Sequence, residues 1–246
     1  MRSHLRPVAF AGILLSSVAA LSACKTAPPV TDSQSFDFSG QKLVIDTREA
    51  GLTLVNGAKG KIGVERTRQG NATDKGAATL ALEGGTLKLF VECSGVNLGC
   101  EGKHTVSVPP GVDIELRGSG SRVNGRDLAG DLTAQLRNDA SIALDGPSGA
   151  LNINANGGGI TLNGVKSKQV TAVAAADGNV TLEFATAPDK VEARSTGGYA
   201  NVTLPAGPET YRVDAPGKDN LATDPGSART VTVRSSEGRA KVQKSG

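Results

Sequence analysis

DLTAQLRNDASIALDGPSG (131–149) and ALNINANGGGITLNGVKSK (150–168) are consecutive segments built to one pattern. Each contains a run of alternating apolar and polar residues, a turn rich in Gly, Asn or Asp, a second alternating run and a second turn. In the first run, Leu132, Ala134 and Leu136 alternate with polar residues. Because successive side chains point to opposite faces of a strand, this period of two predicts two half-buried strands per segment.

The same pattern recurs on both sides of these segments. QVTAVAAADGNVTLEFATAPD (169–189) and KVEARSTGGYANVTLPAGPET (190–210) repeat it, KLVIDTREAGLTLVNG (42–57) lines up with it, and ATLALEGGTLKLFVEC (78–93) gives another strand pair around two glycines. A unit of about 20 residues buries its apolar face only by stacking on its neighbours. We therefore predict an all-β fold, with residues 36–246 forming a single-domain, parallel β-helix-like solenoid.

A sandwich of meandering hairpins is the alternative all-β arrangement, since it also has regularly spaced turns. The constant offset between the apolar pairs favours the solenoid. The segment DAPGKDNLATDPGSART (214–230) is the least regular, and we expect it to cap the stack, with Val231, Val233 and Val242 closing the end.

Composition agrees with an all-β fold and excludes one class of partner. Aromatic residues make up 3% of the chain, and its 32 glycines are expected to supply positive φ in tight turns. Without residues 1–23, which carry Arg2 and Arg6, 25 Lys and Arg balance 24 Asp and Glu. No basic cluster stands out, so we expect no nucleic-acid partner.

The N-terminal stretch has the three parts of a secretory signal. Arg2 and Arg6 precede an apolar run, and that run ends in small residues. The run is shorter than the roughly 20 residues of a membrane span, which makes an uncleaved transmembrane anchor the weaker interpretation. An ordinary signal peptide followed by a chance cysteine is the other alternative.

Leu21, Ser22, Ala23 and Cys24 resemble the lipobox of bacterial lipoproteins. The resemblance implies a signal peptide over residues 1–23, cleaved before Cys24, and acyl chains such as palmitate on Cys24. Residues 24–35 would then be the lipidated N-terminus and a tether. We expect an extracytoplasmic protein anchored to the cell membrane by lipid on Cys24, or to the outer membrane if the cell has two.

Cys93 and Cys100 are predicted to form a structural disulfide, because an exported protein occupies an oxidising compartment. Two free thiols are the alternative, and the spacing does not match a redox CxxC motif. His104 is the only histidine after the leader, so a metal site lacks ligands. We expect His104 to be a surface residue near the disulfide loop.

VPPGVDIELRGSGSRVNGRDLAGDLTAQL (108–136), with the units after it, resembles the bacterial "putative adhesin" family of β-strand repeats, related to the head domains of putative autotransporter adhesins. The resemblance covers residues 36–246 and implies a parallel β-helix-like stack of glycine-punctuated coils. The family's Thr-Gly-Ser-Gly-Asp turn survives in part at residues 118–121 and degenerates in later units. The family implies surface adhesion without a general activity.

Residues for catalysis are not gathered in the sequence. No G-x-S-x-G motif accompanies His104, and Glu115, Asp131, Asp145 and Glu183 are scattered acids without the aromatic residues of a sugar-gripping groove. We predict a protein that is not an enzyme, holds no cofactor or metal, and binds an envelope glycan or a surface protein. A passive structural or stress-associated envelope lipoprotein is the alternative, and a polysaccharide-processing enzyme is a weaker one.

Overall fold

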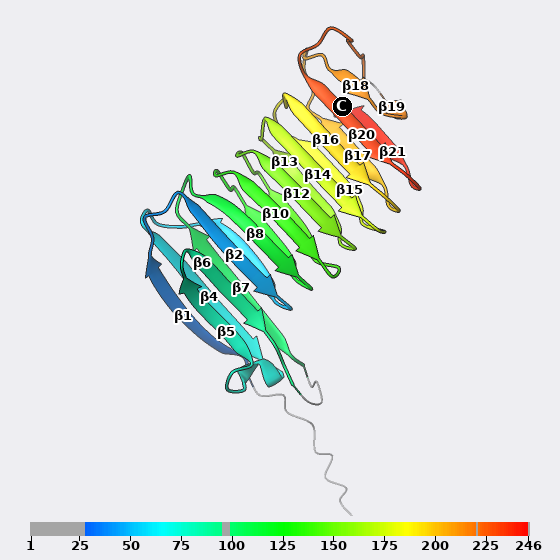
Figure 1. Cartoon of the computed structure of the whole chain (residues 1–246). Helices are drawn as coiled ribbons and strands as arrows, with labels where there is room; N and C mark the ends of the chain where they lie inside the picture. The colour runs from blue at the N-terminus through cyan, green and yellow to red at the C-terminus, as the bar shows by residue number, and fades with distance from the viewer. Residues whose placement is uncertain (1–27, 95–98, 220, 246) are drawn as a thin grey trace, which may run out of the picture.

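The computed structural model describes residues 28–94, 99–219 and 221–245, and these consist almost entirely of β-strands joined by short turns (Figure 1). The strands form two large sheets, one 11-stranded and one 10-stranded. The helical structure in the described residues is a single 3₁₀ turn, η1 (Gly70–Thr73). The prediction of an all-β fold is confirmed.

Strand order in the two sheets does not follow chain order throughout. The 11-stranded sheet contains, from edge to edge, β1 (Val30–Asp37), β4 (Lys61–Gln69), β7 (Glu101–Val108), β3 (Gly51–Asn56), β9 (Arg122–Arg126), β11 (Ser141–Asp145), β13 (Ile160–Val165), β15 (Val180–Phe184), β17 (Ala200–Leu204), β21 (Ala240–Lys244) and β19 (Gly217–Asp219). The 10-stranded sheet contains β18 (Arg212–Asp214), β20 (Thr230–Ser235), β16 (Lys190–Ser195), β14 (Gln169–Ala175), β12 (Leu151–Asn156), β10 (Leu132–Arg137), β8 (Asp113–Ser119), β2 (Lys42–Arg48), β6 (Thr86–Val91) and β5 (Ala78–Glu83).

From β8 to β17 the chain alternates between the sheets, and each strand pairs in parallel with the strand two positions later. The pairing places equivalent residues of successive units side by side, as where Leu132 pairs with Leu151 and Ile142 with Ile160. The residues predicted to face inward are buried: Leu132, Ala134, Leu136, Ile142, Leu144, Leu151, Ile153, Ile160, Leu162, Val170, Ala172, Val180, Leu182, Val191, Ala193, Val202 and Leu204.

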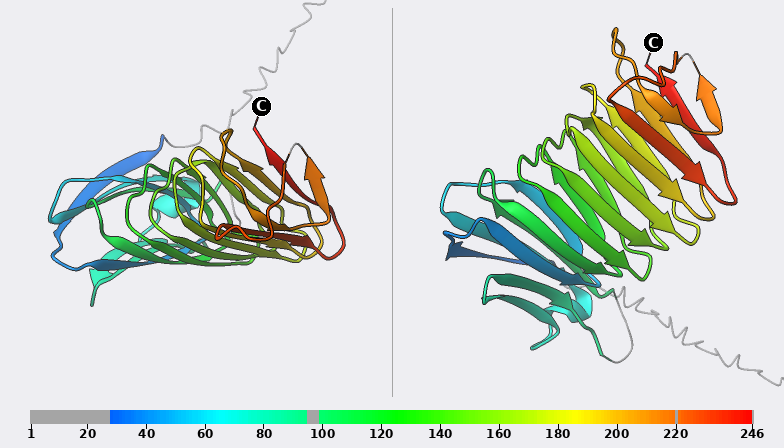
Figure 2. Two further views of the ribbon diagram at one scale, coloured as in Figure 1. Left: turned by 90° about the horizontal axis from the view of Figure 1, so that it is seen from above. Right: turned by 45° about the horizontal axis from the view of Figure 1, so that its top comes forward.

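The two sheets lie face to face (Figure 2). Buried residues from both sheets form one apolar core between them. The alternate residues face solvent, and Thr133, Gln135 and Asn152 are exposed as predicted. Full burial of a leucine or isoleucine side chain stabilises the fold by about 1.5–3 kcal/mol, so the core stripe is the main source of stability.

The first strands of the chain are not at the end of the stack. β2 lies between β8 and β6, and β3 lies between β9 and β7, all in parallel. Residues 42–57 therefore form a regular unit, as predicted, but one that is inserted between later parts of the chain. Beyond it, β4 runs antiparallel to β7, and β1 runs antiparallel to β4.

The segment 78–93 forms two strands but is not a repeat unit, which corrects the prediction. β5 and β6 are an antiparallel hairpin within the 10-stranded sheet. Gly84 and Gly85 at its turn have φ of 55° and 77°. Positive φ at both central residues is the requirement of a type I′ turn, and this turn joins antiparallel strands directly.

The tether predicted over residues 24–35 is shorter than expected, because β1 begins at Val30 and pairs along its length with β4. The strand was missed because five consecutive polar residues, Thr31 to Ser35, interrupt any apolar alternation between Val30 and Phe36. Asp32 points into the fold, where Arg66 and Arg68 on β4 bind its carboxylate.

At the C-terminal end, too, the order of strands in the sheets departs from their order in the chain. The short strands β18 and β19 form the outer edges, so residues from 214 onward contribute to the cap as expected. However, β20 pairs with both β16 and β18, and β21 with both β17 and β19. Val231, Val233 and Val242 are therefore buried one layer inside the end and do not close it.

A column of glycines lies along one line of turns. A Cβ atom on Gly158 would lie 1.9 Å from the Ala140 carbonyl oxygen, and one on Gly178 would lie 2.4 Å from that of Gly158. Gly198 and Gly238 repeat the contact one unit further each time. These four glycines do not have positive φ, in contrast to our expectation. They are required because adjacent turns approach too closely for any side chain.

We predict that Gly158→Ala lowers the free energy of unfolding by about 1–3 kcal/mol, because the new methyl group must displace the Ala140 carbonyl. The matched control is Gly159→Ala, whose Cβ would meet its nearest atom at an ordinary 3.5 Å. Urea unfolding followed by circular dichroism measures both. Equal midpoints for the two variants would contradict the close-approach explanation.

Candidate functional site

The solvent-facing sides of the two sheets are the largest surfaces on which the protein could act. Along the 11-stranded sheet, one outward row passes through Thr67, Lys103, Gly51, Arg122 and Ser141 on neighbouring strands. These positions alternate with buried residues, so the strand pairing that builds the core also fixes the spacing of the outward side chains.

A hollow of about 740 Å³ lies on this row, where Gly51 has no side chain between Lys103 and Arg122. Glu49 and Glu101 also line it, and Lys103 Nζ lies 3.7 Å from a Glu101 carboxylate oxygen. The positive charges of Lys103 and Arg122 in its wall equal the negative charges of Glu49 and Glu101 in number. The hollow therefore has no net preference for a cationic or anionic ligand.

A half-buried charged cluster occupies the inner face of the same sheet near its first edge. Arg66 donates from Nε and Nη2 to the two carboxylate oxygens of Asp32 at 3.0 and 2.9 Å, and Arg68 Nη2 donates to the same carboxylate at 2.8 Å. Arg66 Nη1 also donates to the carbonyl of Ala78, at the start of β5 in the opposite sheet. The cluster thus joins the two sheets where the apolar core ends.

The hydrogen bonds from Arg66 lower the pKa of Asp32 below its ordinary value, so its carboxylate is ionised at neutral pH. The sequence does contain a signal for this cluster. In KIGVERTRQ the inward apolar positions Ile62 and Val64 are followed, at the same period of two, by Arg66 and Arg68. When arginines occupy the inward positions that follow apolar ones, an acidic residue on a neighbouring strand must face inward to pair with them, because burying an unpaired charge is costly.

His104 belongs to this region and is buried, with 1% of its surface exposed, which corrects the expectation of a surface residue. On β7 it pairs with Arg66 on one side and with Leu52 on the other. Neither ring nitrogen has a hydrogen-bond partner of good geometry among the described residues. Burial, reinforced by the Arg66 charge, lowers the pKa of His104 to about 4, so the imidazole is neutral at physiological pH.

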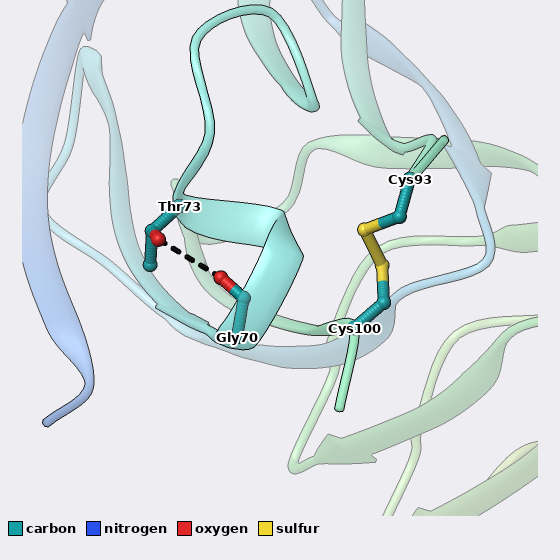
Figure 3. The surroundings of a disulfide bond; sticks show 4 residues. All are labelled: Gly70, Thr73, Cys93 and Cys100. Atoms are coloured by element: carbon teal, nitrogen blue, oxygen red, sulfur yellow. Dashed lines mark hydrogen bonds between the residues drawn. A yellow bond between two sulfur atoms is a disulfide. The ribbon is translucent and has the colours of Figure 1, made fainter. Parts of the chain in front are cut away.

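Cys93 and Cys100 form a disulfide in the structure, with their Cα atoms 6.3 Å apart (Figure 3). It spans the connection between β6 and β7, and so links the two sheets. The bond lies beside η1, where Thr73 donates from Oγ1 to the carbonyl of Gly70 at 2.8 Å. Ala50, Ala72 and Val91 form a small buried cluster against the two cysteines.

The acids considered for catalysis are not brought together. Glu115 faces outward on the 10-stranded sheet, whereas Asp145 and Glu183 belong to strands of the 11-stranded sheet. Hydrogen bonds from Lys42 and Arg117 lower the pKa of Glu115. Asp131 accepts a hydrogen bond from the Ala150 backbone at 2.8 Å, linking one unit to the next.

The predicted lipidation site lies outside the described residues, as do Leu21, Ser22, Ala23 and the rest of the signal peptide. In the part of the chain that the structure describes, no helix has the length and apolar character to cross a membrane. The same residues contain no group of three or more His, Cys, Asp or Glu side chains placed to hold a metal ion.

No family model and no curated protein matches the chain. Among solved structures it is similar to a putative adhesin from Bacteroides fragilis NCTC 9343, with 16% identity, a TM-score of 0.54, and coverage of 88% of this chain and 97% of that one. It also matches a putative adhesin from Parabacteroides merdae ATCC 43184, with 12% identity, a TM-score of 0.45, and coverage of 88% and 96%. The first likeness shows a shared fold.

We predict that stability falls as the pH is lowered from about 6.5 to about 4, because the unfolded chain then binds a proton that folded His104 does not. The loss from this residue is about 3 kcal/mol. His104→Leu should remove this part of the pH dependence, measured by urea unfolding across the range. Thr105→Leu, on the outer face of the same strand, should retain it, and an unchanged slope in His104→Leu would contradict the assignment.

Proposed function

We propose that this protein is a lipid-anchored, extracytoplasmic β-solenoid that acts as a non-catalytic, adhesin-like interaction module. The observation that carries the proposal is the pair of long, polar sheet faces whose outward residues are spaced by regular parallel pairing. The fold shared with a putative adhesin supports it. So does the dispersal of the acidic residues, which leaves the outward faces suited to binding and not to glycoside cleavage.

In this proposal, residues 1–23 are a signal peptide and the anchor is lipid on Cys24. β1 begins six residues after Cys24, a distance of at most about 20 Å in an extended chain. The edge formed by β1 and β5 would then face the membrane, and the stack would extend away from it toward β18 and β19 (Figure 1). This orientation would leave the outward faces available to an envelope glycan or a surface protein.

The anchor is tested by labelling cells with radioactive palmitate. The native chain should incorporate label, and Cys24→Ser should not, because the acylated thiol has been removed. The double variant Cys93→Ser, Cys100→Ser is the matched control and should still be labelled. Label retained in Cys24→Ser would place the acyl chain elsewhere and would contradict a lipobox at residues 21–24.

The interaction role is tested by co-sedimentation of residues 25–246 with isolated cell envelopes and with purified wall glycan. Saturable binding is the expected result, and the fraction that binds would contain the partner. Absence of binding to every fraction at low and high salt would contradict the adhesive role and favour a passive envelope protein. Release of soluble sugar from the glycan would instead indicate an enzyme.

A further inference from the structure

A groove crosses the outer face of the 10-stranded sheet where β2, β8 and β10 lie side by side. Its larger part has a volume of about 470 Å³, and its lining includes Arg48, Arg117, Arg137, Asp46, Ser119 and Asn138. A second hollow of about 310 Å³ shares Arg137 and Asn138 with the first and continues over β12, past Asn154 and Asn156. The two hollows together form a continuous polar groove across several strands.

Strand register accounts for the larger part. Ser119 pairs with Arg48 on one side and with Arg137 on the other. A short side chain thus lies between two long ones, whose strands are about 10 Å apart, or two strand spacings. Arg117, two residues before Ser119 on the same strand, contributes a third guanidinium group. The Asn138 amide donates to the Ser119 hydroxyl at 2.8 Å at the floor of the groove.

Two of the three guanidinium groups are held in place by neighbours. Arg48 lies 4.2 Å from the centroid of the Phe90 ring and 3.3 Å from an Asp46 oxygen. Arg117 donates from Nε and Nη2 to Glu115 at 3.2 and 2.6 Å. The guanidinium group of Arg137 makes no hydrogen bond or ion pair with the described residues. With Glu115 counted beside Asp46, three guanidinium groups face two carboxylates, so the hollow keeps a net positive charge and attracts anions.

The chemistry of the lining identifies the kind of anion. Guanidinium groups bind carboxylate or phosphate oxygens through paired hydrogen bonds. The amides of Gln135, Asn138 and Asn154 both donate and accept, as sugar hydroxyls require. The apolar residues of the lining are Leu136, Ala155, Val173 and Ala175, and the lining includes no aromatic ring to anchor a peptide ligand.

We propose that this groove binds an acidic saccharide, a carbohydrate chain that carries carboxylate or phosphate groups. The proposal rests on the proposed function, since it names the ligand class of an interaction module. The anionic group would lie above Ser119 between the guanidinium groups of Arg48 and Arg137. The sugar ring would extend over Gln135 and Asn154.

Calorimetric titration of the full-length protein in detergent micelles tests this proposal. Tetragalacturonate supplies carboxylates, an oligomannoside bearing mannose 6-phosphate supplies phosphates, and maltotetraose is the neutral control. We expect saturable binding of at least one acidic sugar, weaker at higher salt because exposed charges are screened. Binding of neither acidic sugar, or equal binding of maltotetraose, would overturn the proposal. Equal binding of polyglutamate would overturn the saccharide assignment.

The residue-level test is Arg137→Gln, which should weaken binding of the acidic sugar about tenfold or more. Arg126→Gln is the matched control, because it removes the same charge from the outer face of the opposite sheet and should leave the affinity unchanged. Equal affinities of the two variants would overturn the site. If Arg137→Gln loses the sugar but still binds envelopes, the interaction role stands and its partner lies elsewhere.

Discussion

Parallel pairing in constant register is the constraint on which the rest of the structure depends. It places each inward residue directly beside its counterpart in the next unit, as with Leu132, Leu151 and Val170. The core is therefore a set of columns, and each column must be filled with side chains of compatible size. The same constraint acts at the turns, where Gly158 and Gly178 lie so close to the preceding unit that a Cβ atom has no room.

The middle of the fold could be predicted because its evidence is local. Alternation identifies the buried face of each strand, and a constant offset identifies the neighbour. At both ends the evidence is not local. Nothing near residues 42–57 indicates that β2 pairs with β8 and β6. His104 faces inward in the same period of two as Val106 and Val108, and its burial was missed because its side chain is polar. The period of the apolar residues identifies the buried face of a strand. A polar residue that faces inward, such as Asp32, can be recognised only when its partners Arg66 and Arg68 are known.

The two polar regions of the molecule use arginine in different ways. Inside, Arg66 and Arg68 both bind the Asp32 carboxylate, and Arg66 joins the two sheets through the Ala78 carbonyl where the apolar core ends. Outside, Arg48 and Arg117 are only oriented by neighbours and leave part of their hydrogen-bonding capacity to solvent. The half-buried cluster therefore serves stability, whereas the exposed guanidinium groups keep donors available for a ligand.

The strand order at the C-terminal end affects how the protein responds to a pulling force. In a stack that followed chain order, the last strand would be an edge, and a pull on the C-terminus would peel it away from a single neighbour. Here β21 is held by β17 on one side and by β19 on the other, both in parallel. Tension on Lys244 along the strand would therefore act on two hydrogen-bonded ladders at once, and β21 cannot peel away from a single neighbour.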